Sequence, residues 1–193
     1  LQALYFADSF GSMTPSDVVK TSKIFCDGSR HEIGFHAHAN QGLELANAIA
    51  AMDSGVTWID ATVAGMGRGA GNLKLEQLLL YLQNQGENYN PDALLDVLPR
   101  FYHLQKYSGW GWGYDYMLTG MNQIHPGYAH KMNTEHKRLT LKDRVAVIKS
   151  LSEEDKSQVN VSKIKKPDDI AFVIPVRYES TRFPGKPLVD IDG

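Results

Sequence analysis

The sequence predicts an α/β protein built on a parallel sheet, because three strand-like segments alternate with three helix-like segments in its first half. The strand-like segments are short and apolar, and each precedes a longer segment with helical periodicity. Strand–helix–strand repeats form parallel sheets with right-handed crossovers. Part of a closed barrel and an open doubly wound sheet both satisfy this pattern, and periodicity does not choose between them.

Three βα units follow one another in order. The first joins the strand ALYFADS to the helix TPSDVVKTSKIF, with Thr14 as the expected N-cap and Pro15 as the first helical residue. The second joins EIGFHAH to LELANAIAAMDSG, a run of good helix formers that stops at Gly55. The third joins VTWIDATVAG, expected to be a strand covered on both faces, to NLKLEQLLLYLQNQG.

The second half is helical and irregular. Helices are expected over PDALLDVLPRFY and over LTLKDRVAVIKSL, where Thr140 and Asp143 resemble a capping box. The segment between these helices is rich in glycine and aromatic residues, and its aromatic side chains are expected to be core anchors: Trp110, Trp112, Tyr114 and Tyr116. The polar, charged stretch SEEDKSQVNVSKIKKPDD then predicts a linker, and a fresh apolar strand follows it.

Composition excludes several classes of function. The chain has 193 residues, 42% hydrophobic and 22% charged, which indicates a globular protein. A formal net charge of −2 provides no basic field for nucleic acid, and no apolar run approaches the roughly 20 residues that span a membrane. The single Cys26 fits a reducing cytoplasm. The chain starts at Leu1, inside an apolar run, and we expect it to be cut from a longer polypeptide.

A candidate metal site lies at the end of the second strand. His36 and His38 are two residues apart, so their side chains point to the same face at the carboxyl end, where parallel α/β folds place active sites. Two imidazoles there form half of a site for a borderline metal ion. The alternative is a chance His-x-His pattern with each ring packed or solvated. One strand later, the glycine-rich loop IDATVAGMGRGAGN brings Asn72 to the same rim.

These residues resemble a known family. The run GFHAHANQGLELANAIAAMDSGVTWIDATVAGMGRGAGN is similar to the end of the barrel in pyruvate aldolases and 3-hydroxy-3-methylglutaryl-CoA lyases, and most similar to 4-hydroxy-2-oxovalerate aldolases. WGYDYMLTGMNQIHP resembles that family's helical extension. The resemblance covers about residues 3–135 and implies the last three βα units of a (β/α)8 TIM barrel with a helical C-terminal extension.

The resemblance also implies roles for residues. His36 and His38 would be the two histidine metal ligands, with Asn72 as a third ligand. The family's aspartate ligand and general base come from the first barrel strand, so we expect this chain alone to be inactive. Asp8 and Asp60 either orient the histidines or act as loop caps, and both readings stay open.

The implied activity is that of a divalent-metal-dependent aldolase, a lyase that forms or cleaves a 4-hydroxy-2-oxo acid from pyruvate and an aldehyde. The mixed nitrogen and oxygen ligands favour Mn²⁺, with Co²⁺, Zn²⁺ or Mg²⁺ as alternatives. A homodimer is a further expectation, because extensions of this kind often mediate contacts between subunits in the family.

The C-terminal run AFVIPVRYESTRFPGKPLVDIDG resembles a different family, the 3-deoxy-manno-octulosonate cytidylyltransferases, whose first strand and loop it matches. Arg177, Arg182 and Lys186 can neutralise a triphosphate, and the resemblance implies that they contact the phosphates of CTP, with Mg²⁺ as the companion ion. The alternative is a solvated basic loop.

The expected organisation has four parts, which are a partial aldolase barrel (1–88), a helical extension (89–152), a linker (153–168) and the start of a cytidylyltransferase domain (169–193). The favoured function is the aldolase, within a bifunctional protein that builds and then activates a 3-deoxy-2-ulosonic acid. The alternatives are synthesis of a CMP-sugar acid by the C-terminal half, or an inactive metal-binding fragment.

Overall fold

The computed structural model describes residues 2–165, and its first half is the parallel α/β unit that the sequence predicts. Strands β1 (Ala3–Ala7), β2 (Glu32–His36) and β3 (Trp58–Asp60) form one sheet in the order β1-β2-β3. Both pairings are parallel, and their register aligns Ala7, His36 and Asp60 at the carboxyl ends of the strands. The nucleotidyltransferase strand and loop expected at 169–193, with Arg177, Arg182 and Lys186, lie outside the described residues.

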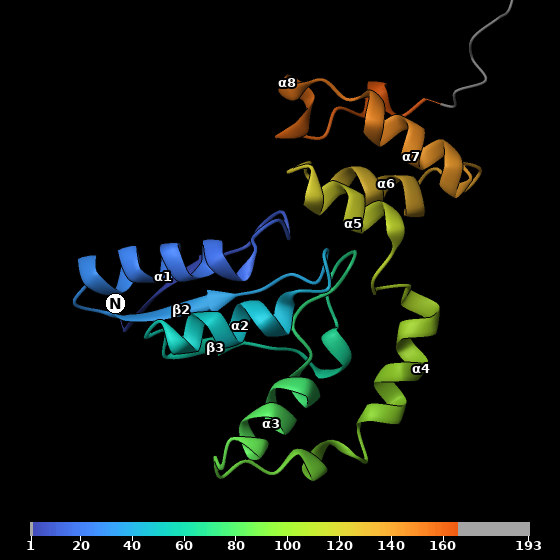
Figure 1. Cartoon of the computed structure of the whole chain (residues 1–193). Coiled ribbons are helices and arrows are strands. Elements are labelled where there is room, and N and C mark those ends of the chain that lie inside the picture. The colour runs from blue at the N-terminus through green and yellow to red at the C-terminus, as the bar shows by residue number, and fades with distance from the viewer. Residues whose placement is uncertain (1, 166–193) are drawn as a thin grey trace, which may run out of the picture.

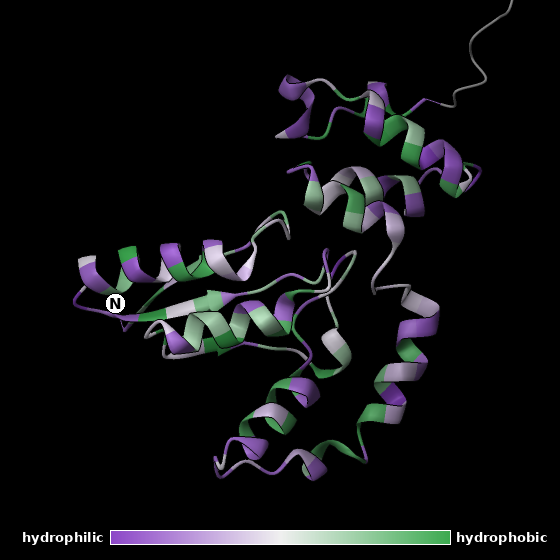
Figure 2. Cartoon of the chain, in the orientation of Figure 1, coloured by the Kyte–Doolittle hydropathy of each residue, from purple (hydrophilic) through white to green (hydrophobic). Residues whose placement is uncertain are grey.

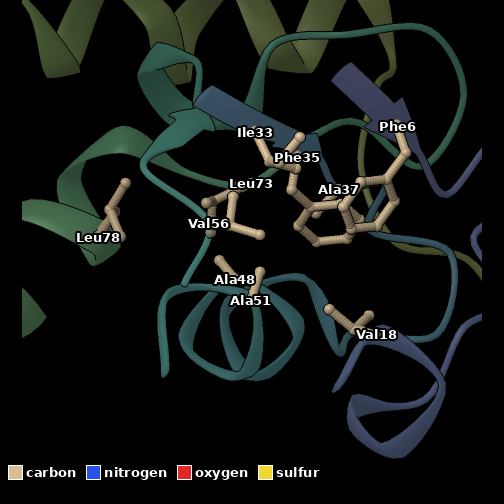
Figure 3. Close-up of a cluster of buried hydrophobic side chains, with 10 residues drawn as sticks. All are labelled: Phe6, Val18, Ile33, Phe35, Ala37, Ala48, Ala51, Val56, Leu73 and Leu78. Atoms are coloured by element: carbon tan, nitrogen blue, oxygen red, sulfur yellow. The ribbon is translucent and has the colours of Figure 1, made fainter. Parts of the chain in front are cut away.

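Three helices pack against one face of this sheet: α1 (Pro15–Gly28), α2 (Glu44–Asp53) and α3 (Leu75–Asn84) (Figure 1). Val18 comes from α1, and Ala48 and Ala51 come from α2; all three are fully buried. Figure 3 shows the two alanines on the side of α2 that faces Val56 and Phe35. Small residues on α2 let the helix lie close to the aromatic residues of the sheet, which is how this core reaches close packing.

The capping of α1 follows the sequence prediction. The Thr14 hydroxyl accepts a hydrogen bond from the backbone N–H of Asp17, and the Asp17 carboxylate accepts one from the Thr14 N–H. Pro15 opens the helix, where the missing N–H costs nothing. The capping box expected at Thr140 and Asp143 is also confirmed.

The third strand differs from its prediction. It is only Trp58–Asp60, and the chain then turns through the 3-10 helix η1 (Val63–Gly65), in which Ala64 has a left-handed φ of 54°. Trp58 is 42% exposed, so the expectation of a strand covered on both faces is wrong here. The reason is that α1, α2 and α3 lie on the other face, and the face of Trp58 has no layer of helices over it among the described residues.

The extension begins with a break that periodicity did not predict. Instead of one helix over PDALLDVLPRFY, the chain forms the 3-10 helix η2 (Pro91–Leu94) and then α4 (Leu98–Ser108). Pro99 explains the break, because proline lacks an N–H and fits only the first turn of a new helix. No residue of α4 is buried, and Figure 2 shows hydrophilic and hydrophobic residues alternating along it.

A second core holds the C-terminal helices together. It lies among α5 (Tyr114–Met121), α6 (Gly127–Thr134) and α7 (Leu141–Ser150), which stack as a separate cluster in Figure 1. Its buried residues are Ile124, Tyr128, Met132, Leu139, Val147, Ile148, Leu151 and Ile164.

Part of the stretch expected to be a linker packs on this core. It contains the short helix α8 (Glu153–Lys156) and the 3-10 helix η3 (Val161–Lys163), and Ile164 is 7% exposed. The fully buried Tyr128 holds the segment, because its hydroxyl donates toward the carbonyls of Asp155 (3.1 Å) and Gln158 (3.3 Å). The same hydroxyl accepts from the Asn160 N–H at 2.9 Å. A polar composition therefore did not prevent residues 153–165 from packing as part of the extension.

The aromatic residues of the extension divide into two groups. Trp110 and Tyr116 are buried, as expected of core anchors, whereas Trp112 and Tyr114 are 59% and 53% exposed. The core-anchor expectation is therefore wrong for the second pair. The indole N–H of Trp110 donates to the Ala64 carbonyl at 3.1 Å. This hydrogen bond joins the extension to η1.

None of the helices among the described residues is long and apolar enough to cross a membrane.

Replacing Tyr128 with Phe is expected to destabilise the protein by about 1–2 kcal/mol, because the buried hydroxyl serves backbone groups of residues 155–160. Hydrogen exchange should show the larger change at the Asn160 amide, which loses its acceptor. Tyr102→Phe, at an exposed ring, is the matched control and should leave both quantities unchanged. Unchanged exchange at Asn160 in Tyr128→Phe would show that this segment is held by something else.

Candidate metal centre

Two cross-strand pairs bring the predicted ligands to one rim. His36 is the register partner of Asp60 at the ends of β2 and β3. Two residues later, His38 forms an antiparallel bridge with Asn72. Residues directly opposite one another carry their side chains on the same face, and residues two apart along a strand share that face. The His36 and His38 rings consequently lie together, with their centroids 4.8 Å apart.

Asp60 orients the first histidine. Its carboxylate oxygen Oδ2 lies 3.0 Å from His36 Nδ1. Because a carboxylate accepts hydrogen bonds, this contact places the ring hydrogen of a neutral His36 on Nδ1. Of the two roles left open for Asp60, the structure shows the contact with the histidine.

The second histidine is oriented by a backbone group. His38 Nδ1 lies 2.7 Å from the Asp8 carbonyl oxygen, which can only accept, so Nδ1 carries the hydrogen. Burial lowers the pKa of His38, and the Asp8 carbonyl partly opposes that shift. The ring is therefore kept neutral near pH 7, with its remaining nitrogen, Nε2, unprotonated.

The Asp8 carboxylate has a different task. Its two oxygens accept hydrogen bonds from the backbone N–H groups of Ser12 (2.8 Å) and Met13 (3.1 Å) and so hold the loop after β1. Burial raises the pKa of this carboxyl group, and the backbone hydrogen bonds act against the rise. Two roles were left open for Asp8. The side chain caps the loop after β1, and the backbone carbonyl orients His38.

Asn72 lies opposite His38 across the backbone bridge. Its amide nitrogen donates to the Met66 carbonyl at 3.2 Å, which leaves Oδ1 available. Gly67 makes room for this amide, since a Cβ at that position would lie 2.8 Å from Asn72 Nδ2. The glycine in the loop thus accommodates the asparagine side chain.

The resulting donor set fits a divalent ion. Both histidines have Nδ1 engaged by an acceptor, which is how metal-binding histidines are oriented, and Asn72 offers an amide oxygen as a further donor atom. Two imidazoles with oxygen ligands suit Mn²⁺, Co²⁺ or Zn²⁺. No cluster of three or more His, Cys, Asp or Glu side chains that could hold a metal occurs within residues 2–165, so further ligands would have to be of another kind or from elsewhere.

Sequence reasoning missed the residues that surround a cavity beside this rim. The cavity has a volume of about 290 Å³ and is lined by His38 together with Arg68, His125 and His130. Arg68 is the one charged residue of the GMGRGAGN run, and that signal was available in the sequence. His125 and His130 lie far away in the sequence and are brought to the cavity by the extension.

The chain matches the HMGL-like family over residues 1–101, more than half of its length. It belongs to the HMGL-like family. Its relatives include the 4-hydroxy-2-oxovalerate aldolase of Thermus thermophilus, 41% identical over 111 residues, which are 54% of this chain and 32% of the relative. The enzyme of that name from Carboxydothermus hydrogenoformans is 42% identical over 97 residues, or 49% and 29% of the two chains. The chain thus spans about a third of the length of the curated relatives it matches.

Solved structures agree with the assignment to the HMGL-like family. The N-terminal domain of a candidate aldolase from Bacteroides vulgatus is 38% identical and superposes with a TM-score of 0.63, covering 72% of this chain and 48% of that one. The carboxyl transferase domain of Rhizobium etli pyruvate carboxylase, determined with pyruvate and biocytin, has a TM-score of 0.63 at 16% identity, covering 80% and 27%. This second likeness concerns the fold alone. The α/β unit is therefore part of a TIM-barrel-type fold, and its relatives are aldolases.

The titration of His38 provides a test of the site's electrostatics. In metal-free protein, the midpoint of the His38 ring, followed by NMR, is expected below its ordinary value of 6.5, because burial penalises the charged ring. The unfolded chain binds the proton more readily than the folded one. Stability should therefore fall as pH drops below about 6.5 and stop falling once pH passes the folded pKa.

His38→Gln is the control for this titration, because it removes the group and should flatten the dependence of unfolding free energy on pH in that window. A His38 midpoint at or above 6.5 would contradict the assigned environment.

Proposed function

We propose that these residues form the metal-binding rim of a divalent-metal-dependent aldolase that forms or cleaves a 4-hydroxy-2-oxo acid from pyruvate and an aldehyde. The observation that carries the proposal is the shared rim of His36, His38 and Asn72, with both Nδ1 atoms engaged. Membership in the HMGL-like family and aldolase relatives at 41–42% identity support it.

Each residue at the rim has a distinct part in the proposal. His36 and His38 hold the ion through Nε2, and Asn72 holds it through Oδ1. The Asp60 carboxylate and the Asp8 carbonyl keep the two rings in the orientation and tautomer that binding needs. The bound ion supplies Lewis-acid polarisation of the keto oxygen of a 2-oxo acid. Mn²⁺ is the proposed ion, with Co²⁺, Zn²⁺ and Mg²⁺ as alternatives.

The neutral state of His38 matters for this role, since only an unprotonated nitrogen binds metal. Burial that lowers its pKa therefore favours binding around neutral pH. The proposal assigns no general base to the described residues, and we propose that this chain does not complete an aldolase site by itself.

Binding of Mn²⁺ tests the rim directly. His36→Ala with His38→Ala is expected to weaken Mn²⁺ binding by at least about 100-fold, because both nitrogen ligands are lost. His31→Ala with His103→Ala is the matched control. It also removes two histidines, one before the start of β2 and the other on the exposed surface of α4, and should bind Mn²⁺ as the unchanged protein does.

Asp60→Asn provides an intermediate case in the same binding measurement. It keeps the shape of the side chain but weakens the hydrogen bond that orients His36, so the affinity should fall by roughly 10-fold. Equal Mn²⁺ affinity in the unchanged protein and the His36/His38 variant, or no binding in either, would refute a metal site at this rim.

A second candidate function comes from the C-terminal run IPVRYESTRFPGKPL, which lies outside the family match and outside the described residues. We propose that it begins a cytidylyltransferase domain and that the natural protein is bifunctional. The two reactions are chemically related, because an aldolase of this kind makes a 3-deoxy-2-oxo acid and this class of transferase activates such acids.

Incubating the natural protein with pyruvate, a sugar aldehyde, CTP and divalent metal ions tests the bifunctional proposal. The expected product is a CMP-sugar acid, detected by mass spectrometry, and Arg177→Gln should reduce it without affecting aldol formation. No such product with any of the metal ions would refute the second function and leave the aldolase proposal standing.

A further inference from the structure

The cavity beside His38 has an unusual lining. Arg68 lines it from the glycine-rich loop. His125, just before α6, and His130, within α6, line it from the extension. Because His38 lines the same cavity, a ligand held at the metal rim can extend into it. The three side chains belong to two regions that are more than 50 residues apart, so only the docked extension creates this site.

A backbone hydrogen bond fixes the tautomer of the neutral His125 ring. Its Nδ1 accepts a hydrogen bond from the Gly127 N–H at 3.0 Å, so the hydrogen of the neutral ring is on Nε2. Burial, followed by the charge of Arg68, lowers the pKa of both His125 and His130, which keeps the rings neutral. The ring of His125 is also positioned by an edge contact with Phe10, with centroids 5.5 Å apart.

The loop that carries Arg68 is fixed at several points. The Arg68 carbonyl accepts from the Gly71 N–H, and the Gly69 carbonyl accepts from the Gly111 N–H at 2.9 Å, which ties the loop to the extension. The guanidinium itself has no hydrogen bond or ion pair among the described residues. An arginine on a fixed loop at the mouth of a cavity is thus available to a ligand.

The charge around this cavity is positive. Its lining, within the described part of the chain, contains no aspartate or glutamate. An adjoining cavity of about 440 Å³, which Arg68 and His130 also line, adds Lys137 and again no acidic residue. The nearby carboxylate of Asp115 is already engaged, because Arg144 Nε lies 2.9 Å from it and Asn133 Nδ2 lies 2.8 Å from it.

We propose that Arg68, His125 and His130 form a recognition site for an anionic group, a carboxylate or a phosphate, at the aldehyde end of the substrate. The inference rests on the proposed aldolase function for the identity of that substrate. The 2-oxo acid end would lie at the histidine rim, and the cavity next to His38 leads away from it. The guanidinium would pair with two oxygens of the anion, and His125 Nε2–H would donate to it. The aldehydes accepted are therefore acidic ones.

Anion binding tests the site without relying on turnover. Inorganic phosphate and succinate are titrated calorimetrically into the protein, with uncharged succinamide as the matched control. Arg68→Gln is expected to weaken both anions by roughly 10- to 100-fold, as the loss of a charge-assisted hydrogen bond does, and Arg68→Lys by less. Arg30→Gln removes an exposed arginine that does not line the cavity and should change nothing. Equal anion affinity in Arg68→Gln and Arg30→Gln would overturn the proposal.

Turnover by the natural protein then tests whether Arg68 recognises an anionic group at the aldehyde end of the substrate. Arg68→Gln should reduce kcat/KM for 4-hydroxy-2-oxohexanedioate, which has a carboxylate tail, and spare 4-hydroxy-2-oxopentanoate, which has a methyl tail. Equal losses on both substrates would overturn the assignment to the aldehyde end. If neither substrate is cleaved but anion binding depends on Arg68, the aldolase proposal fails and the anion site stands.

Discussion

The backbone pairing between residues 37–39 and 71–73 is the constraint on which the rest of the site depends. The Leu73 N–H donates to the Ala37 carbonyl and the Ala39 N–H donates to the Gly71 carbonyl, so two loops that follow different strands become one ladder. This ladder sets His38 opposite Asn72 and continues the pairing of His36 with Asp60. Without it, neither Asn72 nor the arginine of the glycine-rich loop would be placed near His38.

Glycine makes that ladder possible. Gly71 has a φ of +86°, which side chains rarely allow, and a Cβ there would overlap the Gly65 carbonyl oxygen. The loop can therefore fold back on itself while residues 71–73 stay paired with residues 37–39. Its charged side chain, Arg68, is then presented from a backbone that is hydrogen-bonded on both sides.

The helical extension contributes to the site as well as to stability. Trp110 donates to the carbonyl of Ala64, in η1, and the Gly111 N–H donates to the Gly69 carbonyl farther along the glycine-rich loop. The core around Tyr128 holds α6, and with it His125 and His130, against the carboxyl end of the sheet. The extension therefore supplies two of the histidines that line the cavity next to His38.

Several features of this fold could be predicted from the sequence alone, because they depend on residues that are close together in the chain. Hydrophobic periodicity identified the three βα units, cap residues located the starts of α1 and α7, and the spacing of His36 and His38 predicted a shared face, because these features depend on neighbours within a few residues. The tertiary structure alone decided that the Asp8 carbonyl, and not its carboxylate, orients His38, that residues 153–165 pack, and that Arg68 meets His125 and His130. Those outcomes depend on contacts between segments far apart in the chain, which no local pattern of residues encodes.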